Sequence, residues 1–350
     1  MKSVRFLIPG DPDTRTGGYL YDRRIMAGLA ALDWRVELRR LDAGFPRPTP
    51  AALREADEVL AALPDRALTV IDGLALGAMP TVAAAQRDRL RLVALLHHPL
   101  ALETGLDETL RRQLHASERE ALRHVRRVIV TSPSTARALL SEYEVTPERC
   151  VAIPPGTDPA PLAEGSGGGN LDLLCVASLT PRKGHAVLFR ALARLQHHPW
   201  RLFCAGSERL HPPTAALLLD LTEDLGLTGR IAFLGELDEA ALAIRYRRAD
   251  VFVLPSHHEG YGMALAEALA RGLPIVSTTA GAIPDTVSAD AGLLVPPGDE
   301  TALAEALARV MAEPALRERL ATGARAARQS LPDWPEICAR FAAALDEIPA

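Results

Sequence analysis

The chain has 350 residues, which exceeds the size at which one hydrophobic core usually stops growing, so we expect two domains. Apolar residues make up 48% of the chain and charged residues 24%, which excludes wholesale disorder. The net charge of −5 gives no general attraction to nucleic acid, although the first 155 residues are slightly basic and the rest are acidic. We therefore expect no nucleic-acid partner.

The cysteines indicate a reducing compartment, because they lie far apart and share no metal-binding spacing. They are Cys150, Cys175, Cys204 and Cys338. The first ten residues, MKSVRFLIPG, are typical of a strand entering a turn rather than a signal peptide, and no apolar run approaches the roughly 20 residues that cross a bilayer. We expect a cytoplasmic protein, with at most a peripheral contact with the inner face of a membrane.

Short apolar runs alternate with amphipathic stretches along the first half of the chain. Strands are expected at residues 4–8, 36–41, 68–73, 91–96, 127–132 and 150–154. Helical periodicity fills most of the gaps between them. This alternation is typical of an α/β domain with a parallel sheet and helices on both faces.

Residues 155–170, PGTDPAPLAEGSGGGN, are rich in proline, glycine and serine, so we expect a flexible linker that is centred on 161–170. The strand pattern then restarts, at residues 171–178, 200–207, 230–235, 250–256, 274–279 and 292–297. The sequence thus predicts two doubly wound Rossmann-like domains, over 1–160 and 171–330, and a last helix within 331–350. Ligands of such domains bind beyond the carboxyl ends of the strands.

An acidic motif follows one of these strands, in SHHEGYGMALAEALARG (256–272). Glu259 comes directly after the strand DVFVLPS. Gly260 and Gly262 would let a ligand approach the backbone closely, and a helix beginning near Tyr261 would offer unpaired N–H groups to an anion. The pattern favours a phosphate site beside Glu259.

Glu267 stands on the second turn of the same expected helix, in a run that is otherwise apolar. A buried carboxylate must be neutralised, hydrogen-bonded or directed into a cavity, because burying it alone costs several kcal/mol. The hydroxyl groups of a sugar would satisfy it. The alternative is that Glu267 faces water on an alanine-rich helix.

The basic residues are almost all arginine, and the only lysines are Lys2 and Lys183. Lys183 lies in the turn LTPRKG after the first strand of the second half, beside Arg182. A compact ammonium binds phosphate differently from a guanidinium fork, so this lysine is a candidate phosphate ligand. A solvated lysine in a polar turn is the alternative.

The loop after the first strand reads PGDPDTRTGGYLYDRRI and places Gly17 and Gly18 before a helix. The chain lacks GxGxxG and GxxxxGK[ST], which argues against a dinucleotide-dependent dehydrogenase and a P-loop protein. Asp11 and Asp13 form a D-x-D pair, which we interpret as a solvated loop feature. The two glycines are either an ordinary turn or a place where a ligand approaches the backbone.

Two histidines, His97 and His98, directly follow the strand RLVALL, and Glu103 lies a few residues later. No aspartate or cysteine stands at metal spacing beside them, so the sequence does not predict a metal site here. Further along, residues 110–127 predict a basic helix. This helix is either a solvated surface or a contact with anionic lipid.

These segments together resemble the family 4 glycosyltransferases, retaining enzymes of the GT-B fold. The E-x7-E element corresponds to Glu259 and Glu267. The other matching segments are RVIVTSPSTARALLSEY (127–143), CVAIPPGTD (150–158), STTAGAIPDTV (277–287) and AGLLVPPGDETALAEAL (291–307). The resemblance implies two domains facing a central cleft and a last helix that packs back on the first domain.

The resemblance also implies a reaction and a set of site residues. The enzyme would move a sugar from a UDP- or GDP-linked donor to a glycan, lipid or small-molecule acceptor, without a metal or other cofactor. His97 and Glu259 would be catalytic. The donor would contact Gly17, Gly18, Arg182, Lys183, Gly260, Tyr261, Gly262 and Glu267, and the acceptor would contact His98 and Glu103.

One position departs from the family pattern, since Ser178 stands where an arginine is expected, and Arg182 would have to supply that charge. This departure keeps a second hypothesis open, in which the chain is a catalytically inactive scaffold or partner subunit that binds nucleotide sugars. A third hypothesis is an epimerase that acts on the nucleotide sugar alone.

Overall fold

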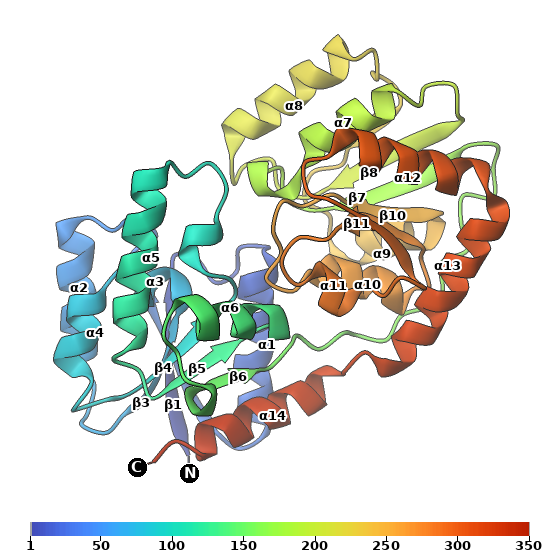
Figure 1. Ribbon diagram of the computed structural model, residues 1–350. Coiled ribbons are helices and arrows are strands. Elements are labelled where there is room, and N and C mark those ends of the chain that lie inside the picture. Colours follow the sequence, from blue (N-terminus) through green and yellow to red (C-terminus); the bar gives the residue numbers. More distant parts are fainter. Residues whose placement is uncertain (1, 350) are drawn as a thin grey trace. The chain divides into compact units, whose positions relative to one another are not determined.

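The computed structural model describes residues 2–349. The chain divides into two compact units, of which the first contains Met1–Gly156 and Pro332–Ala350 and the second contains Thr157–Leu331. Each unit is built around one parallel sheet (Figure 1).

The first unit contains a parallel sheet of six strands in the order β2-β1-β3-β4-β5-β6. The strands are β1 (Ser3–Pro9), β2 (Arg35–Leu41), β3 (Leu68–Asp72), β4 (Arg91–Leu96), β5 (Arg127–Val130) and β6 (Cys150–Ala152). All six lie where the apolar runs predict strands. The central strands β3 and β4 are almost entirely buried, as expected for a sheet covered on both faces.

Helices cover both faces of this sheet, with α1 and α14 on one face and α2, α4 and α5 on the other (Figure 1). Side-chain oxygens of Thr16, Thr49, Asp107, Ser132 and Asp333 cap five helix N-termini. The helices are α1 (Gly17–Ala31), α2 (Pro50–Ala61), α3 (Gly73–Leu76), α4 (Pro80–Gln86), α5 (Glu108–Leu122), α6 (Pro133–Glu142) and α14 (Trp334–Asp346), with short 3-10 turns η1 (Leu100–Leu102) and η2 (Pro147–Arg149).

The last helix, α14, packs against α1 in the first unit, although more than 300 residues separate them in the sequence. The rings of Phe6 and Phe341 stack with centroids 6.2 Å apart. Gly28 of α1 faces Cys338, and a Cβ atom at Gly28 would overlap the sulfur. The missing side chain at residue 28 therefore sets how closely the two helices approach.

The second unit repeats this architecture with strand order β12-β11-β10-β7-β8-β9. The strands are β7 (Leu171–Val176), β8 (Trp200–Ala205), β9 (Ile231–Phe233), β10 (Val251–Leu254), β11 (Ile275–Thr278) and β12 (Gly292–Val295), again as predicted. The first strand of the unit, β7, lies between β8 and β10, so the strand order reverses there. Such a switch point is where α/β sheets bind ligands.

Helices α7, α8 and α12 lie on one face of the second sheet, and α9, α10 and α11 lie on the other (Figure 1). Their bounds are η3 (Pro181–Lys183), α7 (His185–Ala193), α8 (Pro212–Asp224), α9 (Glu239–Arg248), α10 (Met263–Ala270), α11 (Ile283–Thr286), α12 (Glu300–Ala312), α13 (Pro314–Ala327) and η4 (Arg328–Ser330). The core of this unit is one continuous apolar cluster.

The linker predicted at 161–170 is the main departure from the sequence expectations. The units divide between Gly156 and Thr157, and the proline- and glycine-rich segment belongs to the second unit. Its backbone is fastened there, because the N–H groups of Ala163 and Glu164 donate to carbonyl oxygens at the ends of α10 and α9, at 2.9 and 2.7 Å. The Ser166 N–H donates to the Asp250 carboxylate. These hydrogen bonds fix a segment that its composition alone predicted to be flexible.

We expect Gly28→Ala to destabilise the first unit by about 1–3 kcal/mol, the usual cost of inserting a methyl group into a packed contact. The added Cβ would overlap Cys338 and push α14 away from α1. Urea unfolding followed by circular dichroism measures this cost. Gly169→Ala is the control, since nothing lies within 4 Å of its added Cβ. Equal stability of the two variants would contradict the packing described.

Candidate functional site

Two loops of the second unit are tied together at the carboxyl ends of the neighbouring strands β7 and β10. Gly184 has a φ of 72°, and a Cβ atom there would overlap the carbonyl oxygen of Pro255. The His257 N–H donates to the Arg182 carbonyl at 2.7 Å, and Arg182 Nη1 donates to the His258 carbonyl at 2.9 Å. Only glycine suits residue 184, and the turn that carries Lys183 is thereby held against the loop that carries Glu259.

Lys183 and Glu259 form a partly buried ion pair between these loops. Lys183 Nζ lies 2.6 Å from Glu259 Oε1, which also accepts a 2.6 Å hydrogen bond from Ser256 Oγ. Arg182 Nη1 lies 3.6 Å from the other carboxylate oxygen. Glu259 is only 5% exposed. Sequence reasoning selected the lysine, the arginine and the glutamate, but it missed Ser256, whose hydroxyl three residues before the carboxylate was the available signal.

The charges in this cluster depend on one another. Burial alone raises the pKa of Glu259, but Lys183, Arg182 and the Ser256 hydroxyl outweigh it and lower the pKa to about 2. Burial lowers the pKa of Lys183, with a further contribution from Arg182, while the attraction of Glu259 opposes that shift. The carboxylate thus keeps its charge at neutral pH, and the ammonium depends on it for stabilisation.

Helix α10 begins beside this pair, at Met263, close to the start near Tyr261 that the sequence predicted. Gly262 is its N-cap, with a φ of 90° and no side chain to accept the first N–H groups. Such an uncapped helix start can receive a hydrogen-bonded anion. Tyr261 is held by its backbone, whose carbonyl accepts from Thr286 Oγ1 at 3.0 Å, and burial raises the pKa of its phenol to about 12. Gly260 joins Glu259 to this turn.

Glu267 lies on α10 but has a different set of contacts from Glu259. Its Oε2 accepts a 2.9 Å hydrogen bond from Tyr246 of α9, and burial raises the pKa of the carboxyl group. Among the described residues, no hydrogen bond is made to Oε1. The side chain is partly buried, so it is not the solvated glutamate of the alternative interpretation. Tyr246 was not foreseen from the sequence.

His97 and two aspartates form a second cluster, in the first unit. His97 Nε2 lies 3.0 Å from Asp22 Oδ1 and 3.6 Å from Asp72 Oδ2. Asp22 comes from α1 and Asp72 from the end of β3, and both are almost fully buried. Gly18 lies against the imidazole, because its added Cβ would be 3.1 Å from Cδ2 of His97. Sequence reasoning found His97 and Gly18 but missed both aspartates.

The aspartates affect the protonation of His97. Burial lowers the pKa of the imidazole, but Asp22 and Asp72 together raise it above its ordinary value. Burial and the charge of Asp22 raise the pKa of Asp72 to about 7. The Asp72 carboxyl group therefore exchanges its proton close to neutral pH. The three side chains also lie near enough to one another to hold a metal ion, which the sequence did not predict.

The remaining predicted residues of the first unit have contacts of their own. His98 Nε2 is 3.4 Å from Glu103 Oε2, so the two acceptor candidates do contact each other. Gly17 is the first residue of α1, directly after the capping Thr16. Asp11 is exposed, and it accepts a hydrogen bond from the Asp13 N–H within its own loop. The D-x-D pair is thus a surface turn, as interpreted from the sequence.

Comparison with known proteins identifies the family. A model described as Glycosyltransferase Family 4 matches residues 4–161, and one described as Glycosyl transferases group 1 matches residues 163–327. The chain belongs to the family 4 glycosyltransferases. An MMP alpha-(1->4)-mannosyltransferase from Mycolicibacterium hassiacum is 27% identical to it over 320 residues, which cover 87% of this chain and 76% of that protein.

A D-inositol 3-phosphate glycosyltransferase from Kineococcus radiotolerans is 32% identical to this family 4 glycosyltransferase over 243 residues, which cover 61% of this chain and about half (55%) of that protein. Sucrose-phosphate synthase from Thermosynechococcus elongatus superposes with a TM-score of 0.83 over 98% of both chains, at 23% identity. HepE from Anabaena, solved with UDP and glucose, has a TM-score of 0.77 at 19% identity, over 98% of this chain and 99% of that one. These likenesses show the GT-B fold.

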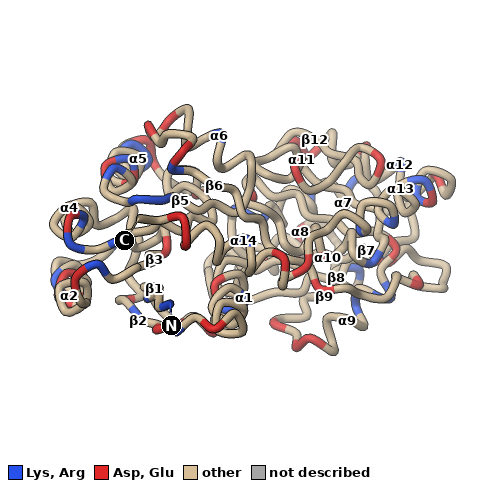
Figure 2. Tube along the Cα trace, turned by 90° about the horizontal axis from the view of Figure 1, so that it is seen from below, with Lys and Arg blue, Asp and Glu red and all other residues tan. Residues whose placement is uncertain are grey.

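The basic helix of this glycosyltransferase is shorter and less basic than predicted. The helix expected over 110–127 ends at Leu122, because the chain turns there and the Arg126 N–H donates to Leu92 in the sheet. Figure 2 shows acidic and basic residues alternating along α5. Glu108 pairs with Arg111 and Arg112, and Glu144 pairs with Arg119 and Arg123. Paired charges favour the solvated interpretation over a lipid contact.

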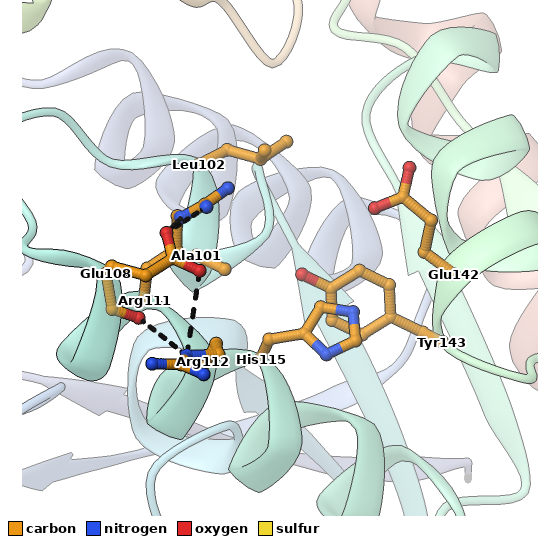
Figure 3. A pocket seen from close by; sticks show the side chains of 8 residues that line it. All are labelled: Ala101, Leu102, Glu108, Arg111, Arg112, His115, Glu142 and Tyr143. Carbon is orange, nitrogen blue, oxygen red and sulfur yellow. Dashed lines mark hydrogen bonds and ion pairs between the residues drawn. The ribbon is translucent and has the colours of Figure 1, made fainter.

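A hollow of about 250 Å³ lies beside α5, and Figure 3 shows the side chains that line it. They are Ala101, Leu102, Glu108, Arg111, Arg112, His115, Glu142 and Tyr143. None of the predicted site residues lines this hollow. Over residues 2–349, no helix combines the length and the apolar character needed to span a bilayer.

We expect Glu259→Gln to lower stability more at neutral pH than in acid. The pKa of Glu259 is about 2 in the folded protein against 4.5 ordinarily, so its charge stabilises the fold above 4.5, and this stabilisation is lost as the pH falls towards 2. The stability gap, which is the difference in the free energy of unfolding between wild type and variant, should shrink by about 2 kcal/mol between about pH 6 and about pH 3. Urea unfolding measures this difference.

Glu305→Gln is the control, because it removes an exposed glutamate of the same unit. Its stability gap should stay small at every pH tested. A gap for Glu259→Gln that does not change with pH would show that the ion pair does not stabilise the fold as described.

Proposed function

We propose that this chain transfers a sugar from a nucleotide-diphosphate sugar to a hydroxyl group of an acceptor, with retention of the anomeric configuration. The observation that carries this proposal is the ion pair of Lys183 and Glu259 at the carboxyl ends of β7 and β10. A lysine and a glutamate that neutralise each other at a switch point suit a ligand with an anionic group beside a hydroxylated one.

The donor diphosphate would take the place of Glu259 as the partner of Lys183. The ammonium would then bind phosphate oxygens, and the uncapped start of α10 would add backbone N–H groups to them. Glu259, released from its ion pair, would accept hydrogen bonds from hydroxyl groups of the donor sugar. Both groups are in place before the ligand arrives, and binding exchanges their contact with each other for contacts with the donor.

The nucleoside would be recognised by Glu267. Its Oε2 is held by Tyr246, which orients the carboxyl group and leaves Oε1 to accept hydrogen bonds from ribose hydroxyls. A vicinal diol is a suitable partner for a carboxylate, because it offers two donors at a fixed spacing. This contact does not depend on the base, so both UDP and GDP sugars suit the site. The UDP complexes of HepE make UDP sugars the first to test.

Charge on the departing nucleotide diphosphate would be stabilised by Lys183, Arg182 and the start of α10. This arrangement supplies the positive charge that other transferases take from a metal ion, and we propose that the reaction needs none. Arg182 already donates to the His258 carbonyl, so it would contribute from a fixed position in place of the arginine that Ser178 replaces.

The first unit would bind the acceptor, with His98 and Glu103 among its contacts and His97 beside the reacting sugar. Gly17 and Gly18 would let the donor phosphates and the acceptor approach the start of α1. The acceptor class is a glycan, a lipid or a small molecule. The named relatives include a mannosyltransferase and enzymes that act on D-inositol 3-phosphate. We propose a cytoplasmic location, which four cysteines without disulfide bonds support.

A catalytically inactive scaffold that binds nucleotide sugars is the second candidate. Ser178 favours it, because the family has an arginine there, and Arg182 is committed to a backbone carbonyl in this structure. The two candidates share donor binding and differ in turnover.

Thermal shift with a panel that includes UDP-glucose and GDP-mannose tests the donor site. We expect the correct donor to raise the melting temperature by mass action, and Lys183→Ala to remove most of that increase. The matched control is Lys2→Ala, since Lys2 is the only other lysine and lies exposed beside Asp346. Equal shifts in both variants, or no shift with any nucleotide sugar, would contradict the assignment of the donor site.

Proton NMR of slow donor hydrolysis tests turnover and stereochemistry. An α-linked donor should release the α-anomer first, and chelation with EDTA should leave the rate unchanged within about twofold. Release of the β-anomer first would contradict retention. Binding without any turnover, with or without acceptors of the three classes, would favour the scaffold.

A further inference from the structure

The ring of His97 is held on several sides by residues of the first unit. Two buried carboxylates face Nε2, and the ring of Tyr21 meets the imidazole edge-on, with centroids 5.6 Å apart. Gly18 lies at Cδ2, and the carbonyl oxygen of His97 accepts a 3.1 Å hydrogen bond from Thr131 Oγ1. An ordinary loop histidine at the end of a strand would not be enclosed in this way.

We propose that Asp22 and Asp72 are positioning residues, which hold His97 with Nε2–H directed inward and present Nδ1 to the substrate as a charged hydrogen-bond donor. This inference rests on the proposed function, in which His97 lies beside the reacting sugar. It adds the protonation state of His97 and the two residues that set it.

The chemistry of the contacts fixes the tautomer. An ionised carboxylate only accepts hydrogen bonds, so the nitrogen 3.0 Å from Asp22 must carry a proton. Nδ1 makes no hydrogen bond to any described residue, and the His97 side chain is 20% exposed. When the ring is neutral, Nδ1 therefore holds the lone pair, and when a second proton binds, Nδ1 becomes the exposed donor.

The two carboxylates also set the charge, because both lie close to the same ring nitrogen in a buried setting where their attraction is weakly screened. They favour the imidazolium form, and the raised pKa of His97 agrees with this geometry. The titratable groups that face the cluster are Asp22, Asp72, Tyr19 and Tyr21. None of them is a cation that would oppose the charged ring.

The aspartates are held differently, which indicates different contributions. Asp72 is the N-cap of α3, and its Oδ1 accepts from the Leu74 N–H at 2.8 Å, so this carboxylate is fixed by the backbone. Asp22 is fully buried, and its Oδ2 has no hydrogen-bond partner among the described residues. A buried carboxylate with an unsatisfied oxygen is costly. Its contact with His97 is the compensation that the structure shows.

NMR of the full chain with ¹⁵N-labelled histidine tests the tautomer without any need for activity. The ten histidines are resolved by long-range ¹H–¹⁵N correlation, and the His97 signals are those lost in His97→Gln. We expect Nδ1 to lose its proton first as the pH rises, which leaves the Nε2–H form. In Asp22→Asn the titration should move to lower pH. A neutral ring protonated on Nδ1, or an unmoved titration in Asp22→Asn, would overturn the proposal.

Kinetics with the donor found by thermal shift test the role in the reaction. Asp22→Asn and Asp72→Asn should each lower kcat about 10-fold or more, leave KM for the donor within about twofold, and move the alkaline limb of the pH profile to lower pH. Asparagine can still cap α3 through its amide oxygen, so Asp72→Asn keeps the fold. The control is Asp65→Asn, an exposed aspartate of the same unit.

Unchanged kcat and pH profile in both variants would overturn the positioning role even if the donor is turned over. If no nucleotide sugar reacts, the proposed function fails, while the NMR titration still decides the state of His97. A titration with MnCl₂ adds one further outcome, since the same three side chains lie within reach of one metal ion. Broadening of the His97 signals at micromolar Mn²⁺ would overturn the proposal in favour of a metal site.

Discussion

The site in the second unit depends on a single ion pair, between Lys183 and Glu259. Burial disfavours the charged form of both side chains, and the attraction between them favours it. Arg182 and the Ser256 hydroxyl add to the stabilisation of the Glu259 carboxylate. Gly184 and the hydrogen bonds between the two loops hold the pair together locally. The loops are neighbours because the strands before them, β7 and β10, are adjacent in the sheet.

Replacing both members of such a pair by apolar side chains often changes stability little, since the cost of desolvating both charges offsets much of their attraction, whereas removing one member leaves the other charge unpaired and destabilises the fold. The ion pair places an ammonium and a carboxylate next to each other, where both can bind a ligand. A ligand that offers an anion to the first and hydroxyl groups to the second can replace the internal contact without leaving either charge unpaired. Water or a simple anion satisfies only one of the two groups, which gives a physical basis for selecting a sugar linked to a phosphate.

The sequence predicted the fold well because parallel strands buried on both faces appear as short apolar runs, and all twelve lie where those runs stand. It also predicted Lys183 and Glu259, since each follows a strand of the second half. It could not show that β7 and β10 are neighbours, because strand order is a property of the packed sheet. The partners Asp22 and Tyr246 were missed for a related reason: they lie on other elements, and their roles come from where those elements pack.

For the segment 161–170, the sequence predicted flexibility that the structure does not show. Composition predicted a flexible segment over 161–170, but composition does not reveal which carbonyl groups a backbone will find, and this segment bonds to the ends of two helices. For His97, the sequence predicted the position but not the partners. Its place after a strand was visible in the sequence, whereas the carboxylates that give it a charge appear only once α1 and β3 pack together.

A crystal structure with an intact or hydrolysed UDP sugar would show whether the donor replaces the ion pair, through the distance between Lys183 Nζ and Glu259 Oε1. That distance is 2.6 Å without a ligand. We expect it to open beyond hydrogen-bonding range, with Nζ against a phosphate oxygen and Glu259 facing the sugar. A nucleotide bound elsewhere, with the ion pair unchanged, would contradict it.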